Sequence, residues 1–375
     1  MNRRSFIQSG IAFSTAGMGC LAGAQAAEWN RCADEHEMAV DSSVTRLRSA
    51  ENPYGPPPGA AEAVASQLAI ANRYPRPVIT AFREKIAQDT GLTSEHVAIG
   101  AGSIELIIQT GLAFGKPGCA HVSGDPTWDT MLVYAQAKGA DWIRVPLTKT
   151  YHYDFDRMLA AITDKVEIVY LCHPNNPTGI AEDHDQLEAF VKEAARSKLV
   201  MVDEAFIDCL DNAEQISMKK LIPDHENVIV VRTFSKLWGM AGFRVGYLLA
   251  HPRVVAKLKA TIPALEMQNR FGVAGAIAAY DDHAFIELSR QRMRKSRSIL
   301  YEIFSRHGLD YIRSDTNFIA FQVPENSQAF VEKMERLHGV SIKSVSLADQ
   351  RNWARVSCGM PTELDAFDHA LKKMI

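Results

Sequence analysis

Residues 232–244 carry side chains that could bind an aldehyde. They read R-T-F-S-K-L-W-G-M-A-G-F-R, which places Lys236 just after two hydroxyl residues, Thr233 and Ser235. A desolvated lysine near other cations has a lowered pKa, and its neutral amine attacks aldehydes. Arg244, eight residues further on, could bind a dianionic phosphate together with the two hydroxyl groups. This segment therefore predicts a nucleophilic lysine beside a phosphate site.

Two more polar positions follow apolar runs upstream of this segment. Asp203 comes directly after residues 199–202, L-V-M-V, and Asn176 lies in the turn H-P-N-N-P-T-G after residues 167–171. An unpaired carboxylate at the end of a buried strand is costly, so Asp203 requires a cationic partner. The turn is favoured by its asparagine, proline and glycine residues, and Asn176 is placed to reach a ligand.

A glycine turn and a tryptophan complete the set. Ala101, Gly102 and Ser103 belong to I-G-A-G-S-I-E-L, a turn that leads into an apolar helical pattern. Free backbone N–H groups at such a helix start bind anions. Trp128, in D-P-T-W-D, offers an aromatic face on which a flat ring could stack.

The elements that position these residues follow from hydrophobic patterning. The runs at 167–171, 199–202, 227–231 and 245–249 are continuously apolar, as in strands covered on both faces. Helical patterns alternate with them, which predicts an α/β fold with a mostly parallel sheet and ligands at the carboxyl ends of its strands. The proline-rich stretch 51–59 predicts a rigid loop, residues 285–307 one long helix, and residues 311–375 a smaller α+β domain.

These residues together supply the parts of a pyridoxal 5′-phosphate site. Such a site needs an amine that reacts with the aldehyde, an acid opposite the ring nitrogen, a set of groups that bind the phosphate, and an aromatic ring that stacks on the cofactor. The chain resembles fold-type I aminotransferases, and it is most similar to the histidinol-phosphate aminotransferase family. The resemblance runs in order from residue 51 to 359 and rests on these motifs: E-N-P-Y-G-P, N-R-Y-P, G-A-G-S, P-N-N-P-T-G, V-D-E-A, S-K-L-W-G-M-A-G-F-R and A-R-V-S-C-G. It implies a large domain with a mostly parallel mixed sheet between helices, plus a smaller α+β domain.

The resemblance also implies a role for each matching residue. Lys236 would form the internal aldimine with pyridoxal phosphate and move the proton between Cα and C4′. Asp203 would keep the pyridine nitrogen protonated, Asn176 would donate to the cofactor O3′, and Trp128 would replace the family's stacking tyrosine. The phosphate would be bound by Ala101, Gly102, Ser103, Thr233, Ser235 and Arg244.

Three further roles concern the substrate and the partner subunit. Arg355 would clamp the substrate α-carboxylate, and Tyr54 would line the substrate side. Tyr74 would reach the phosphate of the neighbouring subunit, which implies a homodimer. For Trp128, Tyr54 and Lys343, a packing or surface role is the competing interpretation.

The sequence departs from the family at two positions. Phe206 replaces a tyrosine that many relatives carry, and the string D-E-A-F also resembles threonine-phosphate decarboxylases, which keeps decarboxylation as the alternative reaction. Lys343 stands where histidinol-phosphate aminotransferases tend to have an arginine for the substrate phosphate. Because arginine and lysine are not interchangeable at a bidentate site, a substrate other than histidinol phosphate is expected. A non-catalytic scaffold is disfavoured, because it would not need Lys236, Asp203 and Asn176 together.

Composition and the first residues limit the partners and the location. The net charge is −3 with 23% charged residues, so the chain lacks the excess of basic residues that is typical of nucleic-acid-binding proteins. The 12 histidines show no spacing typical of metal ligands. Residues 1–26 have two arginines before a modest apolar stretch and an A-Q-A site, which predicts a twin-arginine signal peptide and a periplasmic protein. A retained signal would leave the protein cytoplasmic or membrane-anchored.

The predicted domains are 27–75 (arm and part of the small domain), 76–270 (large) and 271–375 (small).

Overall fold

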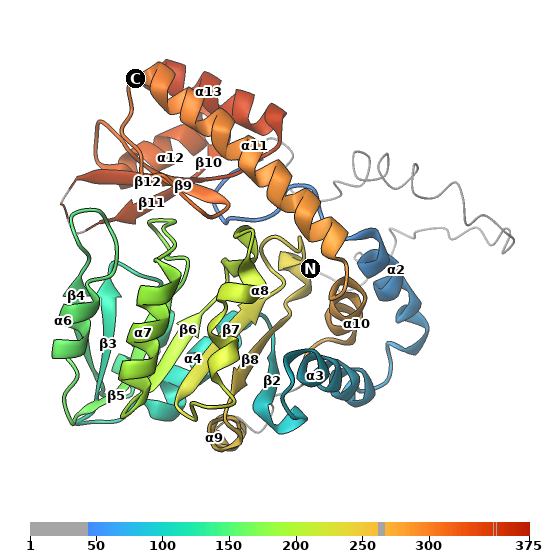
Figure 1. Cartoon of the computed structure of the whole chain (residues 1–375). Helices are drawn as coiled ribbons and strands as arrows, with labels where there is room; N and C mark the ends of the chain where they lie inside the picture. Colours follow the sequence, from blue (N-terminus) through green and yellow to red (C-terminus); the bar gives the residue numbers. More distant parts are fainter. Residues whose placement is uncertain (1–43, 262–266, 348, 350) are drawn as a thin grey trace, which may run out of the picture. The chain divides into compact units, whose positions relative to one another are not determined.

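Seven short strands form a mixed sheet in the order β2-β8-β7-β6-β5-β3-β4 (Figure 1). Strand β8 runs antiparallel to both of its neighbours, and the other neighbouring pairs are parallel. This confirms the predicted mostly parallel α/β sheet, and the four continuous apolar runs become β5 to β8. The strands are β2 (Val97–Gly100), β3 (Ala120–Asp125), β4 (Asp141–Pro146), β5 (Val166–Cys172), β6 (Leu199–Asp203), β7 (Val228–Thr233) and β8 (Gly246–Ala250).

The computed structural model describes residues 44–261, 267–347, 349 and 351–375, all of which belong to one compact unit. The predicted signal peptide lies outside these residues. Among the helices of the described residues, none is long and apolar enough to cross a membrane.

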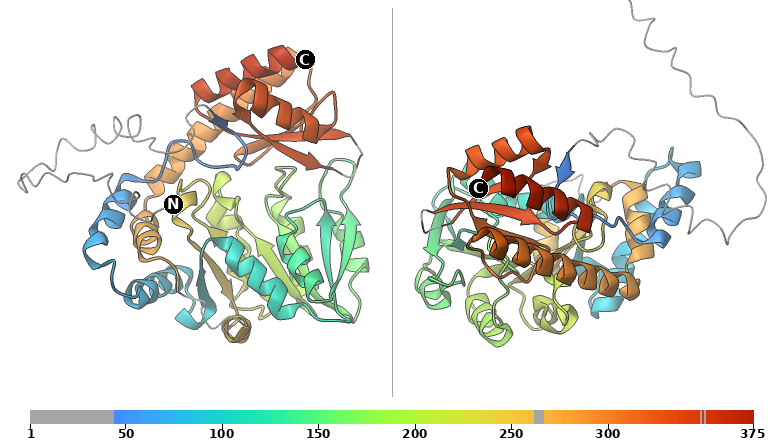
Figure 2. Two further views of the ribbon diagram at one scale, coloured as in Figure 1. Left: turned by 180° about the vertical axis from the view of Figure 1, so that it is seen from behind. Right: turned by 90° about the horizontal axis from the view of Figure 1, so that it is seen from above.

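Helices cover both faces of the large sheet (Figures 1 and 2), which explains why its strands are apolar on both sides. On β6, Val200 and Val202 pack into one core cluster, whereas Met201 packs into the other. Helices α3, α6, α7 and α10 contribute to the first cluster, and α4, α5 and α9 to the second. The helices in this part are α2 (Pro58–Ser66), α3 (Arg76–Thr90), α4 (Ser103–Phe114), α5 (Thr130–Ala137), α6 (Phe155–Ala160), α7 (His184–Ala195), α8 (Ala213–Ile216), α9 (Pro252–Thr261) and α10 (Arg270–Ala279).

A smaller antiparallel sheet in the order β11-β12-β9 packs with the last three helices around a separate core cluster. The N-terminal segment joins this part, since β1 (Thr45–Arg46) pairs in parallel with β10 (Val340–Ser341). The remaining strands and α-helices are β9 (Phe318–Gln322), β11 (Lys343–Ser346), β12 (Asn352–Ser357), α11 (His283–His307), α12 (Ser327–His338) and α13 (Pro361–Met374). The predicted α+β region is thus present, while the boundaries at residues 75 and 270 stay predictions.

Two local predictions concern the ends of elements. The predicted helix at 285–307 is α11. It begins two residues earlier because Asp282 caps it by accepting from Phe285 N, and it ends at His307, where the next residue, Gly308, has a φ of 63°. The predicted loop 51–59 is wrong at its end, because Pro58 and Gly59 already belong to α2. Proline is tolerated at the first helical position, where its missing N–H has no partner to lose.

Candidate active site

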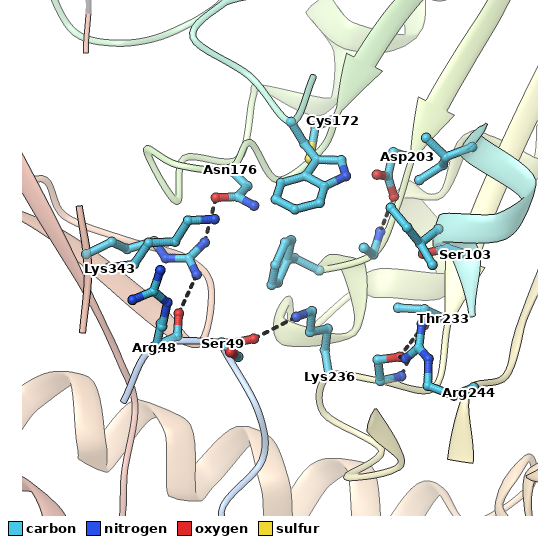
Figure 3. Close-up of a pocket in the computed structure, with 17 residues that line it drawn as sticks. Arg48, Ser49, Ser103, Cys172, Asn176, Asp203, Thr233, Lys236, Arg244 and Lys343 are labelled. Atoms are coloured by element: carbon cyan, nitrogen blue, oxygen red, sulfur yellow. Dashed lines mark hydrogen bonds between the residues drawn. The ribbon is translucent and has the colours of Figure 1, made fainter. Parts of the chain in front are cut away.

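The carboxyl ends of three neighbouring strands bring Asn176, Asp203 and Lys236 to one pocket (Figure 3). Asn176 follows β5, Asp203 ends β6 and Lys236 follows β7. Because these strands are parallel neighbours, their carboxyl ends lie along the same edge of the sheet. The pocket has a volume of about 340 Å³ and is closed on its other side by β11 and β12 of the small sheet, which contribute Lys343 and Arg355.

Most residues singled out from the sequence line this pocket. They are Ser103, Trp128, Asn176, Asp203, Phe206, Thr233, Ser235, Lys236, Arg244, Lys343 and Arg355. Ala101, Gly102, Tyr54 and Tyr74 do not line it, and Tyr74 is 78% exposed. Whether Tyr74 reaches a neighbouring subunit stays a prediction.

Sequence reasoning missed six lining residues: Arg48, Ser49, Ile104, Ile107, Cys172 and Ala205. Four of them lie in or near recognised motifs. Ile104 and Ile107 follow the glycine turn, Cys172 ends β5 just before the turn that carries Asn176, and Ala205 is the last residue of V-D-E-A. Arg48 and Ser49 precede the E-N-P-Y-G loop and belong to none of the recognised motifs.

The Lys236 amine lies among groups that favour its neutral form. Burial, reinforced by the positive charge of Arg355, lowers the pKa of Lys236 to about 8. Its Nζ donates to the backbone oxygen of Ser49 at 2.9 Å and lies 5.3 Å from the centre of the Phe206 ring. A large fraction of this amine is therefore neutral and nucleophilic near pH 8.

The Asp203 carboxylate is buried, with 2% of the residue exposed. Its Oδ1 accepts from the backbone N–H of Ala205 at 3.0 Å, and its Oδ2 accepts from the Tyr170 hydroxyl at 3.1 Å. Burial raises the pKa of Asp203 to about 6, and these hydrogen bonds and the charge of Lys236 partly offset that effect. A cation placed against this carboxylate would favour its ionised form.

Hydroxyl and guanidinium groups surround the start of α4. Arg244 donates from Nη1 to Ser235 Oγ at 3.2 Å, and Thr233 donates to the same Ser235 oxygen at 2.9 Å. Gly102 precedes α4 with φ 76° and no side-chain cap, and a β-carbon there would collide with the Arg244 guanidinium. A phosphate dianion would suit this site. It combines the start of the twelve-residue helix α4, the Arg244 guanidinium and the hydroxyl groups of Thr233 and Ser235.

Arg355 is a buried cation with no carboxylate partner among the described residues that contact it. It is 4% exposed, and it donates from Nη1 to Asn176 Oδ1 at 2.7 Å and from Nη2 to the backbone oxygen of Arg48 at 2.8 Å. Its Nε is buried without a hydrogen-bond partner. Burial and the charge of Arg48 lower the pKa of Arg355 to about 10.

Lys343 adds a second charge of the same sign beside Arg355. The two residues are direct partners across the antiparallel β11–β12 pair, where like charges oppose each other unfavourably. Burial, then Arg355 and Arg48, lower the pKa of Lys343, and Asp129 offsets part of this. Lys343 Nζ also lies 5.2 Å from the centre of the Trp128 ring. This side of the pocket therefore concentrates positive charge that an anionic ligand would neutralise.

Comparison with known proteins gives consistent matches over nearly the whole chain. Residues 42–371 match the family model described as aminotransferase class I and II. A histidinol-phosphate aminotransferase from Moorella thermoacetica is 31% identical over 344 residues, covering 91% of this chain and 88% of the relative. Histidinol-phosphate aminotransferase 2 from Pseudomonas aeruginosa is 32% identical over 340 residues, covering 90% and 91%.

A solved structure agrees with these sequence matches. The crystal structure of histidinol-phosphate aminotransferase from Sinorhizobium meliloti in complex with pyridoxal-5′-phosphate superposes with a TM-score of 0.81 at 25% identity. The match covers 97% of this chain and 99% of that chain.

Proposed function

The chain belongs to the aminotransferase class I and II family, and from that premise we propose how its pocket holds a cofactor and an amino acid. It is a pyridoxal-phosphate-dependent transaminase of the histidinol-phosphate aminotransferase type, which moves an amino group between an amino acid or amine and a 2-oxo acid. The relatives do not favour the decarboxylase alternative.

The residues present fit pyridoxal 5′-phosphate. The start of α4, Ser235 and Arg244 would hold its phosphate, Asp203 would face its ring nitrogen, and Lys236 would meet its aldehyde. Asn176 is already oriented for a further contact, because its side-chain oxygen accepts from Arg355 and leaves its amide N–H groups free to donate to the ring hydroxyl. Bound in this way, the cofactor supplies an electron sink that makes the substrate Cα–H acidic.

The side chains around that Cα have distinct tasks. The Lys236 amine, with its lowered pKa, takes and returns the proton at Cα. Asp203 holds positive charge at the ring nitrogen. Phe206 covers the lysine without offering a hydroxyl group, so Asn176 is left as the side-chain donor for the ring hydroxyl.

The substrate bears an α-carboxylate and carries a second acidic group. Arg355 would bind the α-carboxylate, which explains why a buried guanidinium retains a free Nε. Lys343 and Arg48 remain on the same side of the pocket and repel Arg355. The single observation that carries this proposal is the group of three cations, Arg355, Lys343 and Arg48, none of which forms an ion pair with a carboxylate of the described residues. Such a group favours dicarboxylic amino acids or other acidic amines.

The family's enzymes are typically dimeric, and we propose that a second subunit completes this site. Tyr74 is exposed and lies apart from the pocket of its own chain. This position is compatible with Tyr74 reaching the phosphate of the neighbouring subunit. A Tyr74→Phe variant should then bind the cofactor more weakly while remaining dimeric.

Export by the twin-arginine route is a separate proposal, supported by Arg3, Arg4 and the apolar stretch within residues 1–26. Replacing both arginines with lysine should retain the protein in the cytoplasm. Cell fractionation of the two forms tests this, and equal periplasmic yields would contradict it.

A donor panel tests the reaction itself. The protein loaded with pyridoxal phosphate is mixed with single amino acids and amines, and the absorbance spectrum of the cofactor is followed without any acceptor. We expect acidic donors to convert the cofactor to its amino form faster than neutral donors do. Spectra unchanged by every donor would contradict the proposed reaction.

A further inference from the structure

We propose that Tyr170 is a positioning residue for Asp203, whose carboxylate it orients and keeps ionised for the ring nitrogen of pyridoxal phosphate. The inference rests on the proposed function, because it assumes that the cofactor ring lies against Asp203. It concerns a residue of β5 that lines no part of the pocket.

The strand register brings the two side chains together. Strands β5 and β6 are parallel neighbours in which Tyr170 is the partner of Met201 and Cys172 is the partner of Asp203. Tyr170 and Asp203 are thus diagonal neighbours on one face of the sheet, and the Tyr170 hydroxyl donates to Asp203 Oδ2 at 3.1 Å. The Ala205 N–H fixes the other carboxylate oxygen at 3.0 Å, so both oxygens are held from the protein side.

The surroundings of Tyr170 are otherwise mostly apolar. Its partner on β3 is the buried Ser123, whose hydroxyl donates to Gly124 O at 2.9 Å and accepts from Trp142 Nε1 at 2.8 Å. Tyr170 is fully buried within the cluster formed with α4, α5 and α9. A phenylalanine would fill the same volume without a buried hydroxyl group to satisfy. The hydrogen bond to Asp203 is therefore the specific contribution of the tyrosine.

The hydroxyl acts as a donor throughout the working pH range. Burial, together with the charge of Asp203, raises the pKa of Tyr170 well above its ordinary value, so the phenol keeps its proton. A donor to a carboxylate favours the ionised form and opposes the effect of burial.

The other charged and titratable groups facing Asp203 do not replace this contribution. Lys236 favours the ionised carboxylate, whereas Glu204 disfavours it. Glu204 is itself paired with Arg232 at 3.0 Å, and the Cys172 thiol is kept neutral by burial and by the charge of Asp203. Lys236 acts on Asp203 through its charge and donates instead to Ser49 O, so Tyr170 and the Ala205 N–H are the donors to Asp203 among the described residues.

The test compares Tyr170→Phe with Tyr153→Phe and with the unchanged protein. Tyr153 is a matched control because it is also buried and its hydroxyl bonds Cys172 O at 3.0 Å and Asn175 Oδ1 at 3.0 Å, but not Asp203. The dissociation constant of pyridoxal phosphate is measured by equilibrium dialysis from pH 5 to pH 8.5. Thermal unfolding of each cofactor-free protein verifies that the variants are folded.

In the unchanged protein, cofactor affinity should fall as the pH drops through about 6, because Asp203 becomes protonated there. Loss of a hydrogen bond to a charged group should raise the pH at which affinity falls by about one unit in Tyr170→Phe, so that affinity falls about fivefold at pH 6 and about tenfold near pH 5. In Tyr153→Phe, cofactor affinity should fall at the same pH as in the unchanged protein. With an analogue in which carbon replaces the ring nitrogen, Tyr170→Phe should no longer bind more weakly than the unchanged protein.

Two results would overturn the inference: a Tyr170→Phe profile that superposes on the original, or an equal shift in Tyr153→Phe. Failure of the unchanged protein to bind pyridoxal phosphate at any pH would instead contradict the proposed function.

Discussion

Two buried arginines, one on an inner strand of each sheet, differ in whether their charge is neutralised by neighbouring carboxylates. Arg232, on β7, lies between Glu204 at 3.0 Å and Glu214 at 2.7 Å. Arg355, on β12, contacts an amide oxygen and a backbone oxygen, with Lys343 and Arg48 as its charged neighbours. The first cation is neutralised within the fold, and the second is not.

This difference separates a structural role from a binding role. Glu204 also accepts from Ser217 Oγ and Met218 N, so the Arg232 cluster ties β6 and β7 to the segment that follows Asp203. The Arg355 cluster holds repelling charges in place, which lowers the stability of the ligand-free protein and raises its affinity for anions. Functional sites commonly retain such unfavourable arrangements.

Replacement of Lys236 by alanine should have the largest effect on catalysis. Turnover should fall by at least about 10⁴-fold, because the other pocket amine with a lowered pKa, Lys343, lies on β11 of the small sheet and not at the carboxyl ends of β5 to β7. Folding should be retained, since a desolvated amine contributes little to stability. Steady-state kinetics and thermal unfolding measure the two effects, and turnover within tenfold of the original would show that Lys236 is not the acting base.

Glutamine replacements at Glu204 and at Arg355 test the comparison between the two clusters. Glu204→Gln should lower the free energy of unfolding by about 3 kcal/mol, because it leaves a buried arginine with one carboxylate. Arg355→Gln should change it by less than about 1 kcal/mol, because no ion pair is lost. Urea unfolding of the cofactor-free proteins gives both values. Equal destabilisation would remove the distinction drawn between the two arginines.

Asp203 should make the stability of the cofactor-free protein depend on pH. Its pKa of about 6 in the folded chain exceeds the ordinary 3.8, so the folded form binds the proton more tightly. The resulting stabilisation is full below pH 4 and is lost as the pH rises through 6, with a total of about 3 kcal/mol. Asp203→Asn should lack this dependence. Urea unfolding gives the free energy of unfolding of the two proteins at each pH. If it changed with pH in the same way in both proteins, the raised pKa of the buried Asp203 carboxyl would be contradicted.

Arg48→Ala should have the smallest effect and a selective one. The KM for a dicarboxylic donor should rise about tenfold, because one of the two cations left for its second acidic group is removed, while the KM for a monocarboxylic donor should hardly change. Arg46→Ala is the matched control, since Arg46 pairs with Glu51 at 3.2 Å and does not line the pocket. An equal rise for both donors would assign Arg48 no part in selectivity.

The large sheet and the residues at its strand ends could be predicted from the sequence, because continuous apolar runs and strand exits are local features. Lys236, Asp203 and Asn176 follow neighbouring apolar runs, and all three line one pocket. Arg48 was not found, since its approach to Arg355 depends on how the N-terminal segment crosses the small sheet. Tyr170 lies within an apolar run and was not singled out, because its contact with Asp203 depends on the register of β5 against β6, which the sequence does not show.

The most direct test of the Lys236 mechanism is to fix the bound cofactor in place and find its attachment. Pyridoxal phosphate is added to the purified protein, the complex is reduced with borohydride, and the peptides are analysed by mass spectrometry. We expect the mass of the reduced cofactor on the peptide that contains Lys236, with Lys343 unmodified. Attachment to another lysine, or to none, would contradict the mechanism.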